Sequence, residues 1–289
     1  MSRQVAAAHN LPRTTPAFDM SPPHAVVYVT GASRGLGLAI IKQLLADGVG
    51  VVTLQRTSTP ELDALVNKYP ETLINVTGSV TEPSDNATAV TAALQKFNRL
   101  DAAVLNAGIS VLGTVATTEL STWKLQFDVN VLGVVAGIQA ALPALRNSRL
   151  PGGGRIVLTG SAVANLSPAG LAAYSASKAA LNSIARSLKG EESSITTVSV
   201  HPGIVQTDLV RDLLRDGKDK VHATTYNFFE ASMSTENSGG AGSRASVPPE
   251  VPAKTLAWLA LNAPKELDGK FVNYSDDVVV KLVEASAVA

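Results

Sequence analysis

The amino-acid sequence predicts an α/β fold, with a single doubly wound domain, a seven-stranded parallel sheet and helices on both faces of that sheet. Short apolar runs rich in β-branched residues alternate with longer stretches whose apolar residues recur at helical spacing. The length of 289 residues is usual for one large α/β domain. We expect strands over residues 25–30, 51–54, 73–76, 102–105, 155–159, 195–201 and 271–274.

The first expected helix, over residues 35–47, follows the first strand directly. Its apolar residues Leu36, Ala39, Ile40 and Leu44 lie on one helical face, and a glycine follows as a C-cap. The same spacing predicts further helices over residues 87–97, 120–145 with an end near Pro143, and 174–188.

Two regions fall outside this alternation. Residues 1–24 contain four prolines, and we expect a flexible extension there, with residues 25–289 forming the single domain. Arg3 and Arg13 precede the first acidic residue, so an organelle-targeting role for the extension stays open. We expect residues 207–250 to form a variable substrate loop that contains two charged helical turns, followed by a Gly/Ser-rich part, 232–246, that is either a lid or disordered.

The composition excludes several classes of function. Lys plus Arg and Asp plus Glu both number 24, so the chain has no net charge to attract nucleic acid. It has no cysteine, which excludes disulfides and thiolate metal sites. We found no apolar run of membrane-spanning length, and Asp276 and Asp277 are too isolated to predict a metal site. We expect no nucleic-acid or membrane partner and no metal.

A glycine-rich turn separates the first strand from the first helix. It reads Thr30-Gly-Ala-Ser-Arg-Gly-Leu-Gly37, and its functional positions are Gly31, Ser33, Arg34, Gly35, Leu36 and Gly37. A pyrophosphate needs a tight turn, a backbone that it can approach closely, and a helix N-terminus aimed at its charge. The position of the glycines between strand and helix therefore predicts a dinucleotide site.

The end of the second strand indicates which dinucleotide. An acidic residue there would bind the ribose 2′-hydroxyl of NAD, but the sequence has Gln55 and Arg56. A guanidinium suits a 2′-phosphate, and Arg34 in the glycine turn is placed to reach the same group. The sequence predicts NADP(H) as cofactor.

Tyr174 and Lys178 stand four residues apart at the start of a helix and share one face. A tyrosine hydroxyl has a pKa of about 10, and a nearby ammonium is expected to lower it toward the range useful for proton transfer. Ser161 follows the fifth strand, where its hydroxyl could bind a substrate oxygen. His201, at the end of the sixth strand, reads as a structural residue.

Together these motifs resemble the short-chain dehydrogenase/reductase family in its compact, non-extended, Rossmann-type form. The resemblance covers about residues 25–275 and rests on six motifs in order. They are the glycine turn, Asn106-Ala-Gly108, Asn130, Ser161, Tyr174-Ser-Ala-Ser-Lys178 and Pro202-Gly203.

The resemblance implies roles for the catalytic group. Tyr174 is the general acid in reduction and the general base in oxidation. Lys178 lowers its pKa and holds the nicotinamide ribose, and Ser161 positions the carbonyl oxygen. Asn130 holds a water that links Lys178 to bulk solvent.

The resemblance also implies contacts with the cofactor. Asn106, Ala107 and Gly108 line its adenosine side, while Pro202, Gly203, Val205 and Thr207 flank the nicotinamide. The chain departs from the family after the third strand, where an acidic residue that faces adenine is replaced by Ser79, followed by Val80.

The predicted function is NADPH-dependent reduction of a ketone, aldehyde or diketone, or the reverse oxidation. Two alternatives stay open: an imine or biosynthetic-intermediate reductase or dehydratase on the same site, and an NADPH-binding sensor without turnover. A small-molecule carbonyl or alcohol is the expected partner. The family also implies a homodimer or homotetramer, and we expect a cytoplasmic location.

Overall fold

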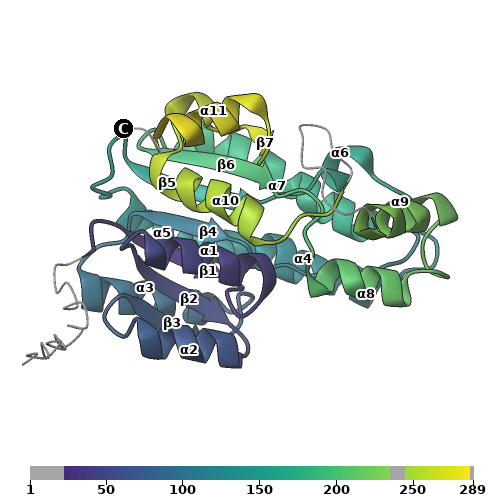
Figure 1. Ribbon diagram of the computed structural model, residues 1–289, viewed down its shortest axis with the longest axis horizontal. Coiled ribbons are helices and arrows are strands. Elements are labelled where there is room, and N and C mark those ends of the chain that lie inside the picture. The colour runs from purple at the N-terminus through teal and green to yellow at the C-terminus, as the bar shows by residue number, and fades with distance from the viewer. Residues whose placement is uncertain (1–22, 235–244, 287–289) are drawn as a thin grey trace, which may run out of the picture.

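The computed structural model describes residues 23–234 and 245–286. Its centre is a seven-stranded sheet in which every pair of neighbouring strands is parallel, in the order β3-β2-β1-β4-β5-β6-β7 (Figure 1). The fold prediction is confirmed, and the strands lie within about one residue of their expected ends. They are β1 Val26–Thr30, β2 Gly50–Gln55, β3 Leu73–Thr77, β4 Ala102–Leu105, β5 Gly154–Thr159, β6 Ile195–His201 and β7 Phe271–Asn273.

Burial on both faces explains why the strands are continuous apolar runs. Successive residues of β1 point to opposite sides, so Val27 and Val29 join one core while Val26 and Tyr28 join the other. The first core packs against α1 (Gly35–Ala46), α10 (Glu250–Asn262) and α11 (Asp277–Ser286). The second packs against α3 (Pro83–Phe97), α5 (Gly133–Leu145) and α7 (Ala172–Glu191).

The helical stretch over residues 120–145 differs from its prediction. It consists of α4 (Leu120–Phe127), a π-helical turn (Asp128–Leu132) and α5, and Pro143 lies inside α5 instead of ending it. Pro143 falls two residues before the end of α5, and because proline has no N–H it donates no hydrogen bond to the carbonyl of Gln139.

This stretch is also long and apolar enough to cross a membrane, with a mean hydropathy of 1.5 in its best window. It is not an uninterrupted apolar run, because Asp128, Asn130 and Gln139 fall within it. A core helix passes the same test, and Ile138 and Ala141 of α5 are buried against the sheet.

Helix α8 (Asp208–Asp216) lies where the sequence predicts charged helical turns. The helices not predicted are α2 (Pro60–Lys68), α6 (Val163–Leu166), α9 (Ala223–Ser234), α10 and α11, with a 3₁₀ turn at Lys265–Leu267. Helices α6, α8 and α9 lie beyond the carboxyl ends of the strands (Figure 1) and share a third apolar cluster that includes Val163, Val210, Leu213 and Phe229.

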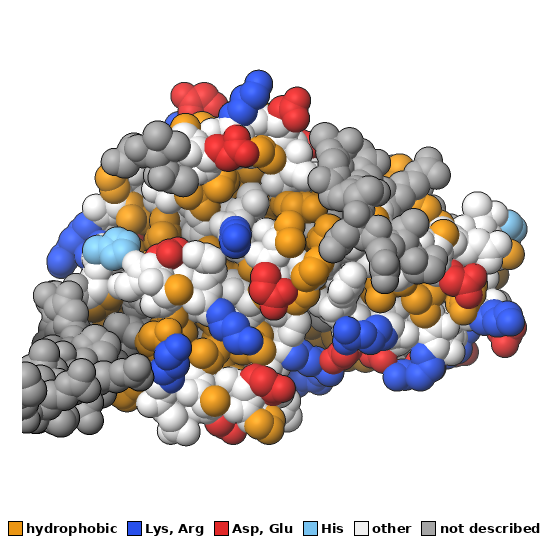
Figure 2. Space-filling model, viewed as in Figure 1, with side chains coloured by type: hydrophobic (Ala, Val, Ile, Leu, Met, Phe, Trp, Pro, Cys, Tyr) orange, Lys and Arg blue, Asp and Glu red, His pale blue; other side chains and the backbone are white. Residues whose placement is uncertain are grey.

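Two predictions fall largely outside the described residues. Of the predicted 1–24 extension, only the last two residues are described, and most of the 232–246 segment is likewise not covered. At the end of that segment, Val247 forms a parallel bridge with Val205. Acidic and basic side chains are interspersed over the face drawn in Figure 2.

Candidate functional site

The glycine turn packs so tightly that a side chain could not fit at Gly31 or at Gly37. Gly31 has a φ of +69°, and a Cβ on it would lie 2.9 Å from the Cα of Ala107. A Cβ on Gly37 would collide with the carbonyl oxygen of Gly31. Helix α1 begins at Gly35 and receives no side-chain cap from Arg34, so its first N–H groups are left for a ligand. This cradle fits the pyrophosphate of a dinucleotide.

The other residues of the turn have structural contacts. Leu36 is buried in the first core, and the carbonyl of Ser33 accepts a hydrogen bond from Thr59 Oγ1 at 2.7 Å. Thr59 also caps α2 by accepting a hydrogen bond from the N–H of Leu62.

The end of β4 is tied to the end of β1. Thr30 Oγ1 accepts hydrogen bonds from the N–H groups of Asn106 (3.0 Å) and Ala107 (3.1 Å). The Asn106 side chain donates back to the carbonyls of Thr30 and Gly31 at 3.2 Å. These bonds hold the Asn106–Gly108 segment against the glycine turn, at the edge where ligands bind in open parallel sheets.

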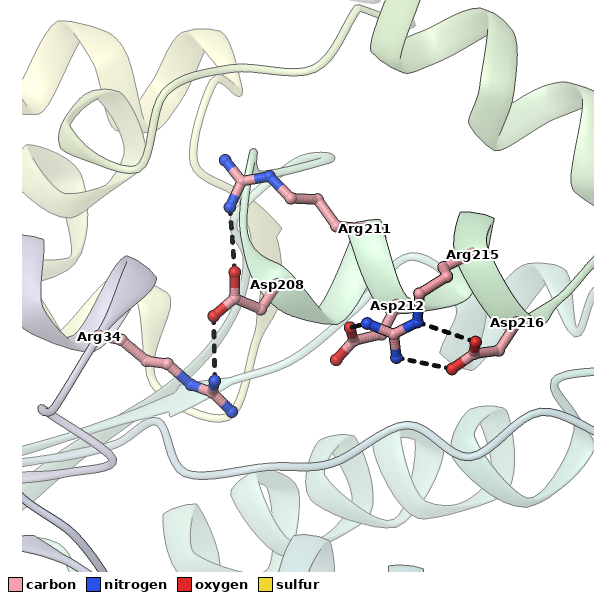
Figure 3. Close-up of polar contacts among 6 residues, drawn as sticks. All are labelled: Arg34, Asp208, Arg211, Asp212, Arg215 and Asp216. Atoms are coloured by element: carbon pink, nitrogen blue, oxygen red, sulfur yellow. Dashed lines mark hydrogen bonds and ion pairs between the residues drawn. The ribbon is translucent and has the colours of Figure 1, made fainter.

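The two arginines expected to share a phosphate have different surroundings. Arg34 forms an ion pair with Asp208 at 3.0 Å, and Asp208 also pairs with Arg211 at 3.0 Å (Figure 3). Arg56 is exposed directly after Gln55, whose amide donates to Val76 O at 3.2 Å. The structure therefore turns Arg34 toward α8.

The side chain of Thr207 packs close to the glycine turn, because a Cβ on Gly35 would come within 3.0 Å of the Thr207 Cγ2 atom.

After β3, the Ser79 hydroxyl hydrogen-bonds Thr81 Oγ1 at 2.8 Å, and the Ser79 N–H donates to Asp85 Oδ2 at 2.8 Å. Val80 packs against the second core.

Tyr174, Ser161 and Lys178 come together at the carboxyl end of β5. Tyr174 is the third residue of α7, and its side chain lines the same cavity as that of Ser161. Lys178 Nζ lies 5.7 Å from the Tyr174 ring centroid and donates to the carbonyl of Thr159 at 2.7 Å. The Lys178 side chain is buried, with 3% of the residue exposed.

Burial controls the protonation of this group. It raises the pKa of Tyr174 to about 12, an effect that the hydrogen bond with Ser161 opposes, and it lowers the pKa of Lys178 to about 8. The sequence reading had expected Lys178 to lower the Tyr174 pKa. Here desolvation dominates, so the Tyr174 hydroxyl keeps its proton at neutral pH and is suited to donate it.

Asn130 sits within the π-helical turn and is fully buried. Its amide donates to Ile109 O (2.8 Å) and Ser177 Oγ (3.0 Å), and its oxygen accepts from the Ile109 N–H (2.8 Å). Both amide donors are thus occupied by protein atoms. A Cβ on Gly108 would lie 3.3 Å from the Asn130 oxygen and 3.5 Å from Lys178 Nζ, so these two residues meet at Gly108.

The segment after β6 forms one edge of a cavity of about 590 Å³ that Ser161 and Tyr174 also line. Pro202 is buried, and Gly203 has a φ of +80° with the Tyr274 ring against it. His201 lines the cavity, and its Nδ1 atom is buried with no hydrogen-bond partner among the described residues. Burial lowers the His201 pKa to about 4, with Asp276 acting in the opposite direction.

Much of the cavity wall comes from residues 207–250, the region in which the sequence predicts a substrate loop. Leu209 and Leu213 of α8 and Phe228 and Phe229 of α9 line the cavity. Asp276 beside α11 also lines it, and the sequence carries no motif that singles out any of these positions. Around the described part of the chain, no group of three or more His, Cys, Asp or Glu side chains could hold a metal ion.

Comparison with known proteins identifies the family. The model of the short chain dehydrogenase family matches residues 25–218, which is more than half of the chain. The chain belongs to the short-chain dehydrogenase/reductase family. It is therefore an oxidoreductase of a family that binds a nicotinamide cofactor and acts on small molecules.

Curated members of the short-chain dehydrogenase/reductase family cover nearly the whole chain. An uncharacterised oxidoreductase of Schizosaccharomyces pombe is 34% identical over 88% of this chain and 97% of its own. A benzil reductase ((S)-benzoin forming) of Saccharomyces cerevisiae is 30% identical over 87% of this chain and 96% of its own.

Solved structures of the family have the same fold as this chain. A short-chain dehydrogenase/reductase of Saccharomyces cerevisiae superposes with a TM-score of 0.80 at 29% identity, covering 89% of this chain and 98% of that one. A short chain dehydrogenase of Burkholderia cenocepacia in complex with NADP has a TM-score of 0.70 at 28% identity, covering 87% and 96%.

Proposed function

We propose that this short-chain dehydrogenase/reductase reduces a ketone, aldehyde or diketone to an alcohol with NADPH. One observation carries the proposal: the hydroxyl-bearing side chains of Tyr174 and Ser161 both line a cavity that begins where the strands end. Two hydroxyls that face one cavity can both hydrogen-bond one carbonyl oxygen. The relative named as a benzil reductase supports carbonyl reduction.

The bound nicotinamide supplies the hydride that reduces the carbonyl carbon. Ser161 holds the carbonyl oxygen, and Tyr174 gives that oxygen its phenolic proton as negative charge develops. Because burial raises the Tyr174 pKa to about 12, the hydroxyl carries its proton at neutral pH. The reverse oxidation passes through the same transition state, with the Tyr174 oxygen accepting the proton.

Lys178 and Asn130 position this group. Lys178 is held by its hydrogen bond to the Thr159 carbonyl at the end of β5, beneath the Tyr174 ring. Asn130 holds the Ile109 backbone and Ser177 and therefore keeps the loop after β4 close to α7. Its amide donors are occupied, so we assign it this holding role in place of water binding by the side chain.

We also propose NADP(H) over NAD(H). The second strand ends on Gln55 and Arg56 with no carboxylate to hold a 2′-hydroxyl, and Arg56 is exposed and available for a 2′-phosphate. Structural relatives with bound NADP and NADPH support this preference. A Michaelis constant for NADH equal to or lower than that for NADPH would contradict it.

The decisive experiment compares Tyr174→Phe with the wild type over a panel of aryl ketones and diketones. General acid catalysis contributes roughly 10²- to 10⁴-fold, so we expect kcat to fall by at least about 100-fold while the Kd for NADPH stays within about twofold. Tyr69→Phe, at the end of α2, is the matched control and should keep full activity. Near-normal turnover by Tyr174→Phe would overturn the mechanism.

We further propose a homodimer or homotetramer. Leu120, Leu125 and Leu132 are 83%, 50% and 58% exposed along one continuous helical stretch, and exposed apolar groups of this size favour burial against another surface.

A further inference from the structure

The cavity beside Tyr174 is enclosed mainly by large apolar side chains. Leu166, Leu171, Leu209, Leu213, Phe228 and Phe229 line it, drawn from α6, α7, α8 and α9. The rings of Phe228 and Phe229 meet edge to face at 5.4 Å. A volume of about 590 Å³ falls in the range that surrounds medium-sized organic ligands. The walls therefore favour a bulky apolar compound.

The charges around the cavity all have one sign. Among the described residues that line it there is no Lys or Arg, while Asp276 and Asp277 contribute carboxylates. Asp276 is fixed by the N–H and the side-chain amide of Asn273, each at 2.8 Å. His201 does not add a positive charge, since burial lowers its pKa to about 4.

The nearest cations are directed elsewhere. Lys178 is buried and its ammonium donates to the Thr159 carbonyl. On α8, Arg211 pairs with Asp208, and Arg215 pairs with Asp212 and Asp216 (Figure 3), and both arginine side chains are more than half exposed. Val210 and Leu213 of the same helix are buried toward the cavity. Helix α8 thus presents its apolar face to a ligand.

From this arrangement we infer that the cavity selects uncharged, bulky apolar carbonyl compounds and rejects those that carry a carboxylate or a phosphate. An anion would lose its hydration against apolar walls, meet no cation among the described residues of the lining, and be repelled by Asp276 and Asp277. A neutral ketone of the same shape has none of these costs. The inference rests on the proposed carbonyl reduction.

A matched pair of substrates tests the charge alone. The neutral 4-acetylbenzamide and the anionic 4-acetylbenzoate have the same ketone, ring and outline, so a difference in kcat/KM reports the charge. We expect kcat/KM for the amide to exceed that for the acid by at least about tenfold at pH 7, because an unpaired carboxylate is far costlier to desolvate than an amide.

A designed cation supplies the second arm of the test. Leu166 lines the cavity but is 72% exposed, so Leu166→Arg should fold while placing a guanidinium at the rim. We expect it to shrink the amide-to-acid ratio by roughly fivefold, whereas the uncharged Leu166→Gln leaves the ratio unchanged. A Coulomb interaction between charges about 8 Å apart in partly aqueous surroundings gives an effect of this order.

The outcomes separate the inference from the function on which it rests. Turnover of the acid equal to that of the amide would overturn the inference while carbonyl reduction stands. A ratio that Leu166→Arg leaves unchanged would overturn charge as its cause. Reduction of neither compound by protein that binds NADPH, with the wider ketone panel also unreduced, would overturn the proposed function and this inference with it.

Discussion

Replacing the buried Lys178 with methionine should stabilise the folded protein while abolishing carbonyl reduction. Burial lowers the pKa of Lys178 from 10.5 to about 8, which corresponds to about 3 kcal/mol acting against the ammonium in the folded state. The hydrogen bond to the Thr159 carbonyl, lost in the variant, returns about 1–2 kcal/mol of this. Methionine fills the same space without a charge, so the net gain should be about 1–2 kcal/mol at pH 7.

The gain should depend on pH in a defined direction. Below pH 8 the lysine is charged in both the folded and the unfolded states, and the full penalty is present. Between pH 8 and 10.5 the folded protein releases the proton and the unfolded chain keeps it, so wild-type stability rises relative to the variant. Because the wild type regains about 3 kcal/mol over this range and the gap at pH 7 is only about 1–2 kcal/mol, the gap should be largest below pH 8 and reverse in sign by about pH 10.

Urea unfolding of wild type, Lys178→Met and Lys189→Met at pH 7 and pH 10 measures this gap. Lys189 lies on the same helix with an exposed side chain, so its replacement should leave stability nearly unchanged. A Lys178→Met variant less stable than the wild type at pH 7 would refute the reasoning, as would a gap of equal size at both pH values.

Two further predictions concern the cofactor and the assembly. Asp208→Asn frees Arg34 from an exposed ion pair worth about 1 kcal/mol at most, so the KM for NADPH should fall by up to about fivefold while that for NADH, which lacks the 2′-phosphate, stays constant. An equal change for both cofactors would contradict this competition. Sedimentation should find a dimer or tetramer that Leu125→Glu weakens, and a wild-type monomer at all concentrations would reject the assembly.

The sheet was predictable because burial on both faces leaves a direct mark on sequence. In β1 every residue from Val26 to Thr30 is buried, and the run is accordingly short, apolar and β-branched. Helices with a weaker apolar periodicity were not predicted. Only Leu62 of α2 is buried, so no apolar stripe marked that helix, although Thr59 as N-cap and Pro60 at the first turn were available signals.

In the candidate site, too, some features could be predicted from the sequence and others depend on packing. Ser161 and Tyr174 come from positions fixed by the end of β5 and the start of α7, so their meeting followed from topology. The protonation of Tyr174 did not, because it depends on how deeply the ring is buried. The cavity walls depend on how α8 and α9 pack beyond the carboxyl ends of the strands. Phe228 and Asp276 both line the cavity because of this packing, which no local sequence pattern encodes.

The π-helical turn at Asp128–Leu132 sets a limit on how this chain can vary in length. Its hydrogen bonds span five residues in place of four, so the turn takes up one extra residue while α4 and α5 keep their rotational phase. One residue in an α-helix corresponds to about 100° of rotation, so a deletion between Gln126 and this turn would rotate Gln126, which hydrogen-bonds both backbone groups of Val111, away from that loop. Members of this family should therefore tolerate a single-residue deletion within the turn far better than one in α4 or α5.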